Sequence, residues 1–257
     1  SLSPVQPSYS SDTNTNFASM YRICNSYESP SPSRPIALAR SRVQKQYVVN
    51  FLALRGNLGK PGAGPCPVRG HSNVQGDRTM GIWEAPPEAF LKRLSREFKF
   101  EAPRKHGVSA VEAIQVMHQT PGKVFFALGG NFISANPDTE YTATALRNCR
   151  LTVQVSTKLN RSHLITGREA IILPCLGRTD IDEQATGLQF VTTENSQGYV
   201  SPSRGFLTPP SETCLSEPAI ISGLGRAYFG ESSLVDWEAL ASDYRLIRAH
   251  IASVIPG

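Results

Sequence analysis

Residues 124–157 decide the fold, and they read VFFALGGNFISANPDTEYTATALRNCRLTVQVST. The stretch begins with a fully apolar run, Val124–Leu128, which predicts a central strand of a parallel sheet because such strands are buried on both faces. A Gly-Gly-Asn turn follows at 129–131. The Asn136-Pro137 pair then supplies an N-cap and a first-turn proline for a helix that we expect to end near Cys149.

Two more strands are predicted downstream. Leu151–Thr157 forms the second, and Ala170–Leu173, closed by Pro174, forms the third. Strand, glycine turn, helix and strand make a βαβ unit, whose crossover we expect to be right-handed. The sequence therefore predicts an α/β fold with a Rossmann-like parallel sheet flanked by helices.

Apolar residues at helical spacing predict further helices. These are expected from about Arg42 to Leu52, over residues 86–98, over Ser109–His118, and near the C-terminus, where Trp237, Leu240, Tyr244, Ile247 and Ile251 line one face. Ser109 and Glu112 have the spacing of a capping box, which fixes the start of the third of these helices.

The chain is expected to divide into two parts. Residues 1–40 are rich in Ser, Pro, Asn and Tyr and should be disordered, because they bury too little apolar surface to offset their ordering entropy. Residues 41–257 form a partial α/β domain. Within it, Arg55–Gly81 combines many glycines with Arg, His, Asn and Gln, which predicts a long structureless loop that wraps a ligand rather than a flexible linker.

Composition narrows the possible functions. The net charge is +5, but the basic residues are spread along the chain with few aromatics between them, so we expect no nucleic-acid partner. No apolar run is long enough for a membrane helix and the first thirty residues lack a signal sequence, which favours a cytoplasmic protein. The five cysteines are widely spaced without a CxxC pair, so we expect inert thiols rather than a disulfide framework or a metal site.

Two positions are candidates for binding, because ligands of open α/β sheets bind beyond the carboxyl ends of the strands. The first is the turn Gly129, Gly130 and Asn131, where backbone N–H groups and the following helix favour a phosphate. The second is the end of the next strand, which offers amide, hydroxyl and cationic groups at Gln154, Ser156, Thr157, Lys158, Arg161 and His163. The absence of GxGxxG and GxxxxGK[ST] motifs excludes the usual dinucleotide and P-loop signatures. From the residues alone, the prediction is an α/β domain that binds a phosphate-bearing ligand.

Four segments together resemble a known family, the molybdopterin-dependent oxidoreductases of the formate dehydrogenase alpha-subunit-like group, specifically its YdeP-like branch. They are GNLGKPGAGPCPVRGHSNVQGDRTMGIWE, KVFFALGGNFISANPDTE, LTVQVSTKLNRSHLITGREAIILPCLGRTDIDEQ and FVTTENSQGYVSPSRGFLTPPSE. The likeness runs from about Arg42 to Gly257 in the family's order. It implies part of the formate dehydrogenase and DMSO reductase domain set, and two-electron chemistry at molybdenum on a small-molecule substrate in the intact enzyme.

The resemblance also implies roles for particular residues. The family binds molybdopterin guanine dinucleotide, and its PVRG segment lies beside the metal and the substrate. Arg69 and His71 are therefore the candidate catalytic residues, with His71 standing where formate dehydrogenases have glutamine. Candidate cofactor-binding residues are Gly70, Asn73 and Gln75 for the pterin, Gly129, Gly130 and Asn131 for the phosphates, and Gln154, Ser156, Thr157, Lys158, Arg161 and His163 for the guanosine end.

The chain departs from the family in extent. The segments that carry the iron–sulfur cluster, where present, and the protein ligand to molybdenum are not recognised, so we expect this chain to hold neither, and Cys66 is not at the ligand position. The chain therefore resembles a fragment that works with other segments of a full-length enzyme. Two alternatives stay open: a non-catalytic truncated homologue that keeps the fold as a binding module, and a nucleotide-binding regulator that uses the βαβ unit alone.

Overall fold

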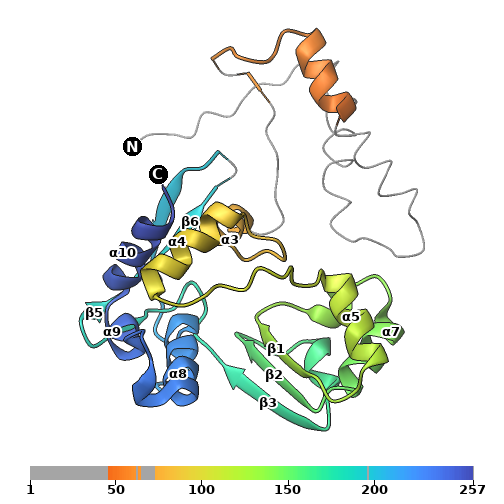
Figure 1. Cartoon of the computed structure of the whole chain (residues 1–257), viewed down its shortest axis with the longest axis vertical. Coiled ribbons are helices and arrows are strands. Elements are labelled where there is room, and N and C mark those ends of the chain that lie inside the picture. The colour runs from red at the N-terminus through yellow and green to blue at the C-terminus, as the bar shows by residue number, and fades with distance from the viewer. Residues whose placement is uncertain (1–45, 62, 65–72, 196, 257) are drawn as a thin grey trace. The chain divides into compact units, whose positions relative to one another are not determined.

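The computed structural model describes residues 46–61, 63–64, 73–195 and 197–256 (Figure 1). The chain divides into two compact units, Ser1–His71 and Ser72–Gly257. In the first unit, residues 46–54 form a helix, in the region where apolar spacing predicted one. The disorder expected for residues 1–40 falls outside the described residues.

The second unit contains a three-stranded parallel sheet of order β1-β2-β3. Its strands are β1 (Val124–Leu128), β2 (Leu151–Ser156) and β3 (Glu169–Pro174). This confirms the predicted α/β class. The prediction that Val124–Leu128 is a central strand was wrong, because β2 lies between the other two in the described sheet. Accordingly Thr152–Val155 are all buried, whereas alternate residues of β1 are exposed.

Three helices accompany this sheet: α5 (Ala110–Gln119), α6 (Phe132–Ala135) and α7 (Thr139–Arg147). They share one buried cluster with Phe125 of β1, so they cover the sheet face that Phe125 belongs to (Figure 1). The cluster consists of Ile114, Met117, Ile133, Ala143, Ala145, Leu146 and Cys149. Burying one of the larger side chains of this cluster stabilises the fold by about 1.5–3 kcal/mol.

The opposite face of the sheet is covered at its centre, where Val153 and Val155 of β2 are buried, and is exposed over the two outer strands within the described residues. Its side chains Val124, Phe126, Leu128 and Ile171 are 53%, 39%, 47% and 45% exposed. The strand register places these four on the same side, because side chains alternate along each strand.

The single helix predicted from Asn136 to Cys149 is two helices. Asn136 is the C-cap of α6, and the N-cap of α7 is Asp138, whose Oδ1 accepts a 2.9 Å hydrogen bond from the Tyr141 N–H. A carboxylate is a strong cap because it also interacts favourably with the positive end of the helix dipole. The start of α5 was predicted correctly, since Ser109 and Glu112 form the expected capping box.

The rest of the second unit is built from helices and short hairpins. The helices are α3 (Val74–Thr79), α4 (Glu88–Phe98), η1 (Arg161–Leu164), α8 (Glu217–Phe229), η2 (Gly230–Ser232), α9 (Trp237–Ser242) and α10 (Tyr244–Val254). The hairpins pair β4 (Glu183–Gln184) with β5 (Gly187–Leu188), and β6 (Val191–Glu194) with β7 (Val200–Ser203). Helix α4 confirms the prediction for residues 86–98.

Two further predictions need correction. Helix α3 lies inside the segment 55–81 that was expected to be structureless. The C-terminal helix is also divided, because Asp243 ends α9 and caps α10 by accepting the Arg245 N–H at 2.9 Å. A short polar side chain that bonds the next turn competes with continued helix, which explains the break.

Among the described residues, no helix is long and apolar enough to cross a membrane.

Cys149, Cys175 and Cys214 are free thiols, and burial raises the pKa of the Cys175 thiol to about 11. Cys24 and Cys66 lie outside the described residues.

Candidate functional site

Two turns meet at the carboxyl edge of the parallel sheet. The first follows β1, where Gly129 and Gly130 have φ values of 72° and 82°, a conformation that favours glycine. The Gly129 N–H donates to the Val155 carbonyl at 2.8 Å, which extends the ladder between β1 and β2. A methyl group added to Gly130 would meet no atom within 4 Å, so the backbone there faces open space.

The second turn follows β2 and is joined to the first by side chains. Asn160 Nδ2 donates to the Gly130 carbonyl at 2.9 Å, and Asn160 Oδ1 caps η1 by accepting the Ser162 N–H at 2.9 Å. Ser162 is 2% exposed, and its hydroxyl accepts from the Ile133 N–H and donates to Asn131 Oδ1. These bonds bring the two candidate binding positions together as one site.

His163 occupies the buried side of this site. It is 7% exposed, and its Nδ1 accepts the Asn160 N–H at 3.0 Å, which leaves the proton on Nε2. This Nε2 has no hydrogen-bond partner among the described residues. A buried donor without a partner costs about 1–3 kcal/mol, so an acceptor that reached Nε2 would stabilise the site.

The other predicted residues of this strand end divide into supporting and exposed groups. Gln154 is 4% exposed, and its amide donates to the Ser162 carbonyl at 3.0 Å. It therefore holds the turn after β2 in place. Ser156 is half-buried and donates to the Lys158 carbonyl at 2.8 Å. Thr157, Lys158 and Arg161 are exposed. The site thus combines two exposed cations, Lys158 and Arg161, with amide and hydroxyl groups that are held by hydrogen bonds.

The predicted pterin-binding residues lie in α3 or next to it. Asn73 is the N-cap residue of α3, and its Oδ1 accepts the Glu194 N–H at 3.0 Å, which ties the helix to β6. Gln75 lines a shallow pocket of about 520 Å³ with Arg78 and Trp83. The hydrogen bonds of Asn73 do not reach the two turns. Arg69, Gly70 and His71 lie outside the described residues.

The predicted run Gln154–His163 included Asn160 and Ser162 without giving them a role, and Glu217 was not predicted at all. Asn160 and Ser162 join the two turns, and their signal was the Asn-x-x-His spacing, which forms a capping box around η1. Glu217, at the start of α8, lies beside Gly129, with its Oε1 3.9 Å from where a Gly129 side chain would begin. Burial, and then the nearby Asp77 carboxylate, raise the pKa of Glu217.

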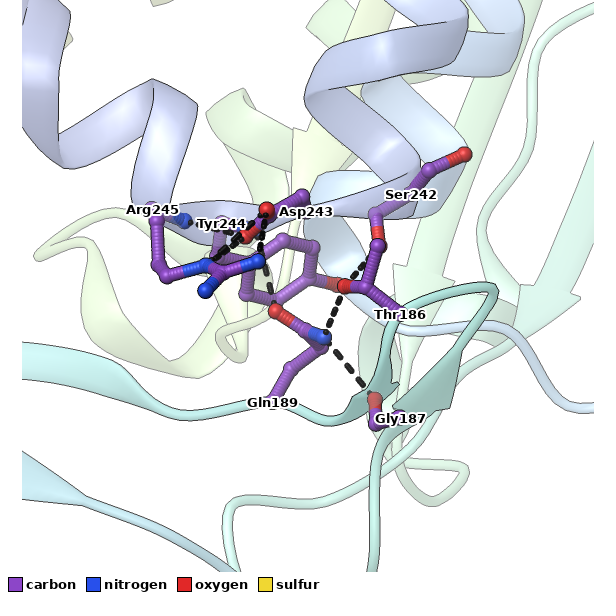
Figure 2. A network of polar contacts seen from close by, with 7 residues as sticks. All are labelled: Thr186, Gly187, Gln189, Ser242, Asp243, Tyr244 and Arg245. Atoms are coloured by element: carbon purple, nitrogen blue, oxygen red, sulfur yellow. Dashed lines mark hydrogen bonds and ion pairs between the residues drawn. The ribbon is translucent and has the colours of Figure 1, made fainter.

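A second polar network supports the helical part of this unit, and Figure 2 shows its contacts around Gln189 and Tyr244. The buried Tyr244 hydroxyl donates to Asp182 Oδ2 at 2.7 Å and lies 2.6 Å from the Ser216 hydroxyl. The Tyr244 N–H donates to Gln189 Oε1, and Gln189 Nε2 donates to Thr186 and Gly187. Burial raises the pKa of Tyr244, so the phenol stays protonated and acts as a structural donor.

A cavity of about 260 Å³ lies beside this network, between α3, β6, α8 and α10. Its walls are mainly apolar. Arg248 is engaged there, since its guanidinium donates to the Phe190 carbonyl at 3.0 Å and lies 3.9 Å from the Phe190 ring centre. Because Asn73, Tyr244 and Arg248 are already bonded to protein groups, the cavity is a weaker candidate for a ligand than the sheet edge.

Comparison with known proteins places the chain among larger relatives. It is 58% identical over 210 residues to an uncharacterized oxidoreductase of Mycobacterium tuberculosis, covering 82% of this chain and 27% of that protein. It is 46% identical over 211 residues to the protein YdeP of Escherichia coli, covering 82% and 28% of the two chains. A nitrate reductase of Klebsiella oxytoca is 28% identical over 174 residues, or 64% of this chain and 19% of that protein.

No family model matches the chain. The likeness to YdeP that the sequence motifs predicted is confirmed. The chain is thus a relative of larger oxidoreductases, and it spans 27% of the length of the mycobacterial one.

Proposed function

We propose that this chain is the portion of a molybdopterin-dependent, formate-dehydrogenase-like oxidoreductase that binds molybdopterin guanine dinucleotide. The names of the relatives support an oxidoreductase, and nitrate reduction is a two-electron reaction. The observation that carries the proposal is the meeting of the Gly129–Asn131 and Asn160–His163 turns at the carboxyl edge of the parallel sheet, where open α/β sheets bind nucleotides.

The residues at this edge fit a dinucleotide. The backbone N–H groups of Gly130 and Asn131 have no partner among the described residues, and the space around a side chain added to Gly130 is open. Such N–H groups suit phosphate oxygens. Lys158 and Arg161 would supply the compensating charge, and the unpartnered His163 Nε2 would donate to a ribose or guanine acceptor.

The chain's own residues would orient and hold the group. When bound, the cofactor supplies two-electron redox chemistry at molybdenum in the intact protein. Arg69 and His71 are the residues we propose for contact with substrate and pterin, Arg69 because a guanidinium is a fixed, permanent cation. Asn73 and Gln75 are proposed to contact the pterin from α3.

Other segments of a longer polypeptide are proposed to complete the enzyme. The chain spans 27% of the mycobacterial relative, and one face of the sheet exposes the apolar side chains Val124, Phe126, Leu128 and Ile171 on its two outer strands. Parallel sheets are normally covered on both faces, so this face suits an intramolecular interface.

The test is to express the chain in a host that makes the pterin cofactor and to assay the purified protein. Molybdenum or tungsten is measured by elemental analysis, GMP by acid release, and the pterin by the fluorescence of its oxidation product. Gly130→Asp places a negative charge where the phosphates are proposed to bind. Gly122→Asp is the matched control, because Gly122 also has a positive φ, 88°, and open space around it, but lies at the other end of β1.

We expect GMP and pterin in the wild-type protein, at least about tenfold less of both in Gly130→Asp, and no change in Gly122→Asp. A wild-type protein without metal, pterin or GMP would contradict the proposal and favour a non-catalytic homologue that keeps the fold. Retention of ATP or NAD instead would favour a nucleotide-binding regulator.

A further inference from the structure

The amino edge of the sheet carries a row of three cations. Lys123, Arg150 and Arg168 each immediately precede one of the three strands, so the parallel register places them side by side. The backbone confirms the order: the Arg150 N–H donates to the Lys123 carbonyl at 2.8 Å, and the Glu169 N–H donates to the Arg150 carbonyl at 2.9 Å. Neighbouring strands are about 4.8 Å apart, so the row spans roughly 10 Å.

Backbone contacts fix the position of Arg168 relative to Arg150. A methyl group on Gly167 would come within 2.5 Å of the Cys149 carbonyl oxygen, so only glycine permits this close approach. The Arg168 N–H donates to the same carbonyl at 3.0 Å. The backbone of Arg168 is thereby fixed beside that of Arg150, and all three side chains are exposed.

None of the three cations has an ion pair or a side-chain hydrogen bond within the described ranges 46–61, 63–64, 73–195 and 197–256. All three are exposed. The adjacent carboxylate, Glu169, alternates to the opposite face of β3 and does not neutralise the row. Three unpaired positive charges in line create a local field that selects an anionic partner.

We propose that Lys123, Arg150 and Arg168 form a docking surface for an acidic helix of a partner protein. A helix that carries glutamates at i, i+4 and i+7 presents three carboxylates along about 10.5 Å, because each residue rises 1.5 Å, and this length matches the row. The strands are parallel, so the surface lies at the end of the sheet opposite the proposed cofactor site. It is therefore independent of the proposed function.

The row suits a helix better than other anions. A small polyanion needs donors that converge in a pocket, whereas these side chains are exposed and extend from a row. A nucleic acid needs a longer basic track with aromatic groups that stack on bases, and no aromatic residue lies between the three cations in the register. The short row supports at most about three phosphate contacts.

The experiment measures binding of a fluorescent, alanine-based helical peptide of about 18 residues, long enough to be helical, with glutamates at i, i+4 and i+7. A control peptide carries the same glutamates on three different faces. Anisotropy is recorded with the 257-residue chain at about 0.01 M ionic strength, where screening is weak, and again at about 0.15 M.

The test variant is the triple substitution Lys123→Gln, Arg150→Gln and Arg168→Gln. The control variant, Lys60→Gln, Lys105→Gln and Arg204→Gln, removes the same charge from exposed positions elsewhere. We expect the test variant to bind the aligned peptide about tenfold more weakly, since each exposed ion pair contributes a small factor. The control variant should bind within twofold of wild type.

Equal weakening in both variants, or equal affinity for the two peptides, would overturn the proposal, because either result shows a nonspecific charge effect. Absence of binding at low ionic strength would overturn it too. A single-stranded oligonucleotide that binds more tightly than the aligned peptide, through the same three residues, would also overturn the proposal. The partner would then be a nucleic acid and not an acidic helix.

Discussion

Asn160 and Gly130 are joined by a 2.9 Å hydrogen bond from the Asn160 amide to the Gly130 carbonyl oxygen, across 30 residues of sequence. The same side chain caps η1 through its other atom. One residue therefore sets both the shape of the second turn and its distance from the first.

Replacing Asn160 should loosen both turns. Asn160→Ala removes a helix cap and the link to Gly130, and we expect a loss of about 2 kcal/mol in the free energy of unfolding. Asn160→Ser keeps a capping oxygen but is too short to reach Gly130, so it should lose about half as much. Urea denaturation monitored by circular dichroism gives both values. Equal stability of the serine and alanine variants would show that the link to Gly130 contributes nothing.

The Tyr244 hydroxyl should contribute measurably to stability. Tyr244→Phe leaves the half-buried Asp182 carboxylate and the buried Ser216 hydroxyl without their shared partner, which should cost about 1–3 kcal/mol. Tyr228→Phe is the control, since Tyr228 is 80% exposed and its loss should stay below about 0.5 kcal/mol. Thermal unfolding of the two variants would contradict the assignment if their midpoints fell by the same amount.

Glu217 should make stability depend on pH. Its pKa is raised in the folded protein, so its contribution is fully present below the ordinary value of 4.5 and is lost as the pH rises through the folded value. Glu217→Gln removes this penalty. We therefore expect the variant to be more stable than wild type at pH 7, with the difference vanishing near pH 4. Urea titrations at both pH values test this, and a variant less stable than wild type at pH 7 would show the opposite sign.

Two glycines of α8 should respond oppositely to alanine. At Gly223 a methyl group meets nothing within 4 Å, so Gly223→Ala should stabilise the helix by about 0.5–1 kcal/mol. At Gly225 a methyl group would lie 2.5 Å from the Trp237 ring, so Gly225→Ala should destabilise by about 1–3 kcal/mol. Denaturation midpoints that moved in the same direction would mean that Trp237 does not pack against α8 as described.

The sequence predicted those elements whose signals are local. The apolar run at Val124–Leu128 and the Ser109–Glu112 capping box both appear where expected, because strand patterning and helix caps depend on near neighbours. The position of β1 within the sheet was not predictable from its own residues. An apolar run suits a central strand and also an edge strand whose faces are covered by other segments. Only the strand pairing distinguishes these two positions.

The site shows the same limit. Gly130 and His163 were predicted from the sequence, and the structure brings their turns together. Gln154 was expected to face the ligand, but its amide is buried under Ser162, because strand alternation decides which face a side chain occupies. Glu217 was missed, since its approach to Gly129 depends on tertiary packing over more than eighty residues of chain.

The α5–β3 region has a consequence for how the chain folds. Its strands, its helices and its buried cluster all come from one continuous stretch, residues 109–174. The strands that pair are consecutive in sequence, and closing the loops between consecutive strands costs less chain entropy than pairing distant ones. This stretch can therefore form its native strand pairs while later residues are still being synthesised. Cys175 and the residues after it can then pack against a sheet that has already formed.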